Sequence, residues 1–61
     1  MSKTVDKIRA ELKTMILAIE DLKGAEGTTR DQFKALNEAG VSLVDAGLHL
    51  KAYQVSREGL H

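Results

Sequence analysis

The sequence predicts an all-α protein, a helical hairpin of two long antiparallel helices that assembles with copies of itself into a homo-oligomeric bundle. Three observations lead to this prediction: two runs of apolar residues repeat at helical spacing, a glycine-rich segment separates them, and the chain contains no proline. The 61 residues form a single domain. Its expected elements are a helix over about residues 3–23, a turn over 24–28 and a helix over about 29–58.

The first helix is predicted from apolar residues that recur in steps of three and four, which places them on one stripe. Ser2 or Thr4 can cap its start, because either hydroxyl can accept a free backbone N–H. Lys23 and Gly24 mark its end, a cation in the last turn followed by a glycine able to adopt positive φ. The predicted inward stripe consists of Val5, Ile8, Leu12, Met15, Ile19 and Leu22.

The second helix follows the segment 24–27, which holds two glycines. Thr29 and Gln32 have the spacing of a capping box, and Gly59 is the expected stop, with residues 60–61 frayed. Gly40 leaves two possibilities open, one helix that is continuous or mildly bent and two helices with a short turn; we favour the first. The predicted inward stripe consists of Phe33, Leu36, Gly40, Leu43, Gly47 and Leu50.

Assembly is predicted because the chain is short and carries more apolar surface than a hairpin can cover. A chain of this size buries only roughly 60% of its unfolded surface, and it has no cysteine for a disulfide. Small residues on the second helix would allow close contacts, either between copies or within the hairpin. The expected oligomer interface consists of Ile16, Leu17, Val41, Val44 and Leu48.

Charge and hydropathy narrow the partners and the location. Nine basic and nine acidic residues cancel, so no net field draws the chain to nucleic acid or to anionic lipid. The longest apolar run, residues 15–19, is far shorter than the ~20 residues that span a bilayer. The first residues lack an apolar signal segment. We expect a cytoplasmic protein that does not enter membranes.

No residue pattern indicates catalysis, and we expect a protein that is not an enzyme and carries neither metal nor cofactor. Asp45 and His49 are four residues apart, which suits an ion pair or two metal ligands. A zinc site needs about four ligands, and no further histidine or cysteine is nearby. The serines and threonines have no base and acid spaced to activate them.

The turn is the candidate ligand site. Gly27, Thr28, Thr29 and Arg30 place a glycine, two hydroxyls and a guanidinium at a helix N-terminus. Such an end is receptive to phosphate, and an arginine there can bind it in a bidentate manner. The spacing is not that of a P-loop, and an ordinary turn is the alternative interpretation.

Thr29-Arg30, followed at a distance by Ala35-Leu36 at the start of a second helix, resembles the helical-hairpin family of phage anti-CBASS and anti-Thoeris proteins. The resemblance covers about residues 8–50. In this chain the turn is longer and lacks proline. The resemblance implies a homo-oligomer that sequesters cyclic nucleotides between subunits without turning them over, with Arg30 and Thr29 contacting phosphate.

Two other classes of function stay open. One is a protein-binding regulator that docks a partner through the apolar residues Val41, Val44, Leu48 and Val55. The other is a nucleic-acid-binding protein. It would use residues 35–42 as the turn of a helix-turn-helix, or Lys3, Lys7, Arg9 and Lys13 as the basic face of a Rop-like bundle. Asp45 in the would-be recognition helix makes this class the less favoured one, because a carboxylate repels phosphate.

Overall fold

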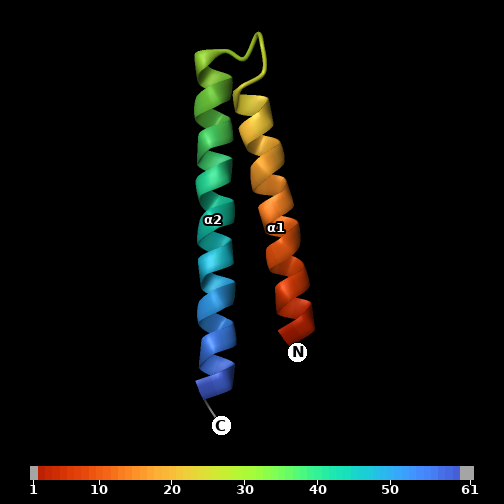
Figure 1. Cartoon of the computed structure of the whole chain (residues 1–61). Helices are drawn as coiled ribbons and strands as arrows, with labels where there is room; N and C mark the ends of the chain where they lie inside the picture. The colour runs from red at the N-terminus through yellow and green to blue at the C-terminus, as the bar shows by residue number, and fades with distance from the viewer. Residues whose placement is uncertain (1, 60–61) are drawn as a thin grey trace.

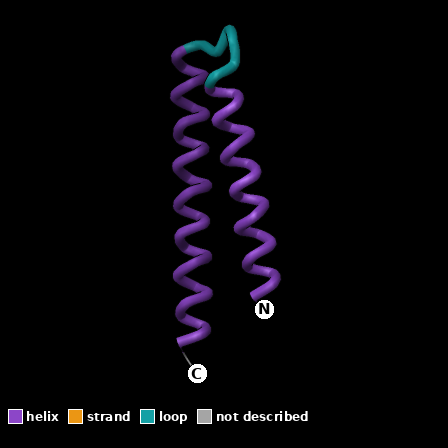
Figure 2. Tube along the Cα trace, in the orientation of Figure 1, coloured by secondary structure: helices purple, strands orange, loops and turns teal. Residues whose placement is uncertain are grey.

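The computed structural model describes residues 2–59 and forms a hairpin of two helices (Figure 1). Helix α1 spans Ser2–Lys23 and helix α2 spans Arg30–Gly59, with a loop over 24–29 between them (Figure 2). The helices run antiparallel and side by side in a molecule of 51 × 16 × 10 Å. The predicted all-helical hairpin is confirmed, and within residues 2–59 there is no strand.

The helix ends lie close to the expected positions. Helix α1 already begins at Ser2, so Thr4 lies within its first turn and does not cap it. Helix α2 begins at Arg30, which leaves Thr29 just outside the helix as its cap, and it ends at Gly59. The expected fraying of residues 60–61 concerns a segment outside the described residues.

Helix α2 is continuous through Gly40, which confirms the favoured alternative. A Cβ at Gly40 would lie 3.8 Å from Cγ2 of Ile19, at ordinary van der Waals distance. A Cβ at Gly47 would meet nothing within 4 Å. Neither position therefore needs glycine for the packing of this hairpin, although glycine costs a helix interior about 1 kcal/mol relative to alanine.

The interface between the helices is thin. Val5 is the one buried apolar residue among the residues whose burial is described, with 7% of its surface exposed. The other inward residues are only half-buried: Leu12, Ile16 and Ile19 from α1, and Leu36, Leu43 and Leu50 from α2. A fully buried aliphatic side chain contributes about 1.5–3 kcal/mol to stability. Because most inward side chains of this hairpin are only half-buried, each contributes less than that.

The predicted inward stripe of α1 is correct for Val5, Leu12 and Ile19 and wrong for its other three members. Ile8, Met15 and Leu22 are 39%, 46% and 54% exposed. The apolar band of α1 is wider than one neighbouring helix, so more than one line of residues could have faced α2. Ile16 and Lys23 turn inward in their place.

The stripe of α2 is predicted better, with one exception. Leu36, Gly40, Leu43, Gly47 and Leu50 are all half-buried. Phe33 is 47% exposed, and it lies beside the end of α1, where Nζ of Lys23 is placed over its ring.

The hairpin exposes 4990 Å² of surface. A compact monomer of this mass exposes about 3,900 Å², so the elongated shape adds roughly 1,100 Å². Within residues 2–59, neither helix combines the length and the apolar character that crossing a bilayer requires.

Candidate functional site

The loop is held by bonds to the end of α1. Gly27 has a φ of 86°, in the left-handed region, and this lets the chain turn back toward α2. The hydroxyl of Thr28 lies 3.0 Å from the carbonyl oxygen of Leu22 and 2.8 Å from that of Ala25. These bonds tie the loop to the last turn of α1, where the carbonyl of Leu22 also accepts the N–H of Ala25. The sequence marked Gly24 as able to adopt positive φ, but the glycine with positive φ is Gly27; the backbone N–H of Gly24 donates to the carbonyl of Glu20 at 3.1 Å.

The capping box at the start of α2 is confirmed. The N–H of Gln32 donates to Oγ1 of Thr29 at 3.1 Å, and the N–H of Thr29 donates to Oε1 of Gln32 at 2.9 Å. Of the two hydroxyls of the predicted phosphate site, that of Thr28 donates within the loop, whereas that of Thr29 serves as an acceptor. Arg30 is exposed, and the acidic residues Glu26 and Asp31 lie near it in the chain. An anion at this turn would rely on the Arg30 guanidinium and compete with two carboxylates.

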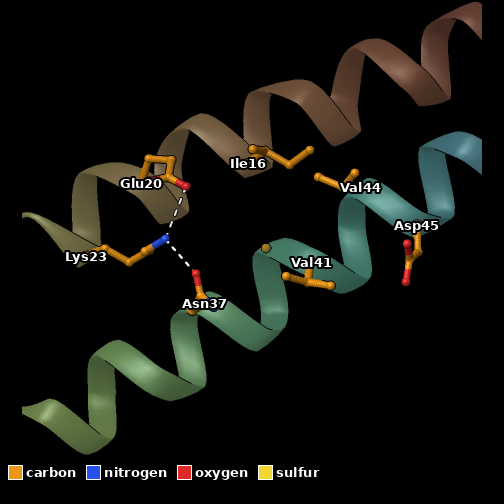
Figure 3. Close-up of a pocket in the computed structure, with 8 residues that line it drawn as sticks. Ile16, Glu20, Lys23, Asn37, Val41, Val44 and Asp45 are labelled. Atoms are coloured by element: carbon orange, nitrogen blue, oxygen red, sulfur yellow. Dashed lines mark hydrogen bonds and ion pairs between the residues drawn. The ribbon is translucent and has the colours of Figure 1, made fainter.

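A shallow groove of about 200 Å³ runs between the helices on one face (Figure 3). Its apolar part consists of Ile16 from α1 with Val41 and Val44 from α2, and Ile16 and Val44 point toward one another across it. Gly40 and Asp45 complete its lining on α2. The groove can receive an apolar side chain, but it encloses no volume in which a substrate would be shielded from water.

Lys23 closes one end of this groove. Its Nζ donates to Oδ1 of Asn37 at 2.9 Å and pairs with Oε1 of Glu20 at 3.3 Å. The same ammonium lies 5.1 Å from the centre of the Phe33 ring, within the range of a cation–π contact. With only 14% of its side chain exposed, Lys23 joins the two helices and sets their register.

Three of the five predicted interface residues, Ile16, Val41 and Val44, meet in the groove. Leu48 continues their line along α2 and is 63% exposed, whereas Leu17 is 58% exposed and does not line the groove. We call Val41, Val44, Leu48 and Val55 the outer α2 stripe. Its members are between 47% and 63% exposed, and their spacing places them on one side of the helix.

Asp45 and His49 do not form part of a metal centre in the described residues, where no group of three or more His, Cys, Asp or Glu side chains converges. Sequence reasoning missed the role of Lys23, which it assigned to the helix end alone. The available signal was Asn37, a polar residue beside the predicted stripe of α2 and opposite the end of α1 in a hairpin.

Comparison of the chain with protein-family models, with curated proteins and with solved structures finds no match.

Proposed function

We propose that the chain is a small binding protein without catalytic activity, which works as a homo-oligomer of hairpins and contacts a protein target through the outer α2 stripe. The observation that carries the proposal is the exposure of this stripe. Four branched aliphatic residues, each about half-exposed or more, follow one line on a 30-residue helix. Contiguous apolar surface of this kind marks interaction sites on soluble proteins.

The chemistry of the neighbouring groove supports binding over catalysis. Its one cation, Lys23, is held by Glu20 and Asn37, and its other charged residue, Asp45, lies among the lining residues. Its remaining lining is mainly aliphatic, which suits the anchor residues of an amphipathic helix laid along α2.

A photoreactive residue tests this surface directly. Benzoylphenylalanine replaces Leu48 in the full chain, and the matched control carries it at His49, the next residue, which is exposed on a different side of α2. We expect a cross-linked product with a protein target at position 48 alone, competed by unlabelled chain and not by the Leu48→Asp variant. Equal cross-linking at both positions, or none, would contradict the proposal.

Sequestration of cyclic nucleotides, as in a phage protein that counters host defence in the cytoplasm, is the second candidate. The observation that favours it is the exposed Arg30 at the start of α2, beside the left-handed turn at Gly27. Native mass spectrometry with a pool of cyclic di- and trinucleotides distinguishes the two. Nucleotide adducts that disappear in Arg30→Ala, while the assembly persists, would support this candidate; unchanged adducts would remove the turn from consideration.

A further inference from the structure

The face of the hairpin opposite the groove carries a second apolar surface, built from both helices. Ile8, Met15 and Leu22 are spaced seven residues apart on α1, so their side chains form one line, which we call the α1 ridge. Ala35, Ala39, Ser42 and Ala46 lie on one side of α2, which we call the small-residue track. Leu22 and Ala35 line the same shallow hollow, so the ridge and the track belong to one face.

The register between α1 and α2 shows which residues of the α1 ridge and of the small-residue track lie at the same level along the helix axes. Three pairs of residues lie opposite one another: Ile19 with Gly40, Lys23 with Asn37, and Asp6 with Gln54. The residue numbers of each pair add to 59 or 60. A residue of α1 therefore lies level with the residue of α2 whose number is close to 60 minus its own.

By this rule Leu22 is level with the space between Ala35 and Ala39, and Met15 is level with the space between Ser42 and Ala46. Residues four apart on a helix are neighbours on its surface, and short side chains leave a depression between them. The large side chains of the ridge thus stand at the heights of two depressions in the track.

We propose that a second copy of this chain covers this face, with the two-fold axis parallel to the helices. Rotation about such an axis keeps every residue at its own height and lays α1 of each copy over α2 of the other. Met15 and Leu22 of each copy then enter the depressions of the partner's track. The product is a four-helix bundle in which every adjacent pair of helices is antiparallel, as the helix dipoles favour.

The alternative two-fold axis, perpendicular to the helices, fits the side chains less well. It would lay α1 on α1 and α2 on α2, so that large residues would face large ones and small residues would face small ones. The large residues between the two α1 helices would then keep the two α2 helices too far apart to pack, since helices approach to about 8–10 Å only where their side chains interdigitate.

The surface area agrees with a dimer of this kind. The hairpin exposes roughly 1,100 Å² more than a compact monomer of its mass, and a stable dimer buries about 800 Å² on each partner. The inference rests on the homo-oligomer of the proposed function and names its interface. Because the outer α2 stripe borders the opposite groove, it stays open in this dimer, and target binding can succeed or fail separately.

The orientation is tested with a single label on the loop. The chain has no cysteine, so Glu26→Cys provides a unique attachment site for a nitroxide spin label. In the proposed dimer both loops lie at the same end, and the labels are separated by on the order of 10–20 Å, which broadens the spectrum. In the perpendicular arrangement the loops lie at opposite ends of a molecule 51 Å long. A monomer, or labels at the longer distance, would overturn the proposal.

Paired variants test the face. Met15→Asp should weaken the dimer by at least about 100-fold, because it buries a carboxylate without a partner. Leu17→Asp, on an exposed side chain of the same helix, should leave the dimer intact. Ala39→Leu fills a depression of the track with a residue that forms helices well, and it should also dissociate the dimer. The matched control Ala52→Leu makes the same change outside the track and should leave the dimer intact. Circular dichroism confirms that each variant is still helical. A dimer that persists in both Met15→Asp and Ala39→Leu would show that this face is not the interface.

Discussion

The two ends of the hairpin are held together in different ways. At the loop end, polar side chains make specific bonds: Lys23 to Asn37, Thr28 to the end of α1, and Thr29 with Gln32. At the open end, the side chain of Val5 is buried, and the bond from Gln54 to Asp6 is 3.5 Å long. The loop end therefore contributes most of the specific polar bonds that define the register, and the open end combines a buried Val5 with one long hydrogen bond.

The difference has a consequence for binding. Polar bonds at the loop end select one register between α1 and α2. Apolar surface elsewhere on the hairpin can therefore stay exposed without changing that register. The outer α2 stripe and the α1 ridge can therefore be presented to partners at fixed heights. Variants at each end of the hairpin measure how much each end contributes to stability. They are compared at one protein concentration, because the apparent stability of an oligomer depends on concentration.

The largest effect is expected for Lys23→Ala. This change removes a charged hydrogen bond to Asn37, the contact with the Phe33 ring and the packing of the lysine stem. We expect a loss of about 2 kcal/mol in the free energy of unfolding, measured by urea denaturation. Lys23→Met, which keeps the stem, should recover part of the loss. Equal stability of Lys23→Ala and the parent chain would show that the loop end does not depend on this residue.

Val5→Ala should have the next largest effect. It removes two methyl groups from the one buried apolar residue among the described residues and should cost about 1.5 kcal/mol. Val55→Ala makes the same chemical change at a side chain that is 55% exposed and should cost less than about 0.5 kcal/mol. Similar losses in the two variants would indicate that Val55 is covered as well, by a partner that the isolated hairpin lacks.

Thr29→Ala should have the smallest of these effects. It removes the hydroxyl that accepts the N–H of Gln32, and loss of such a cap costs about 1 kcal/mol. Thr29→Ser keeps the acceptor and should stay within a few tenths of a kcal/mol of the parent chain. Thermal unfolding followed by circular dichroism measures both. A serine variant as unstable as the alanine variant would point to the threonine methyl group and not to the cap.

Part of the candidate site at the turn could be predicted from the residues, and part of it is defined only by the structure. Thr29 and Gln32 were predicted as a capping box from their spacing, and the structure has both bonds. In those bonds the Thr29 hydroxyl accepts the N–H of Gln32, whereas the Thr28 hydroxyl, also expected at the phosphate site, donates to backbone carbonyls. Sequence could name the hydroxyl, but the choice among its possible partners depends on where the backbone brings them.

By itself the sequence determined that the chain is two helices and a turn. Helical spacing of apolar residues, the absence of proline and the glycines near residue 24 act locally, within a few residues of each element, so they can be read along the chain. The continuity of α2 through Gly40 follows from the same local terms, since one glycine costs little in a 30-residue helix.

Only the tertiary structure decided which line of α1 faces α2. The apolar band of α1 is wide enough that the inward stripe could be completed either by Ile8, Met15 and Leu22 or by Ile16. The bond from Lys23 to Asn37 favours the rotation that turns Ile16 inward and leaves the α1 ridge exposed. That bond joins residues 14 positions apart, and its formation depends on the loop that lies between them.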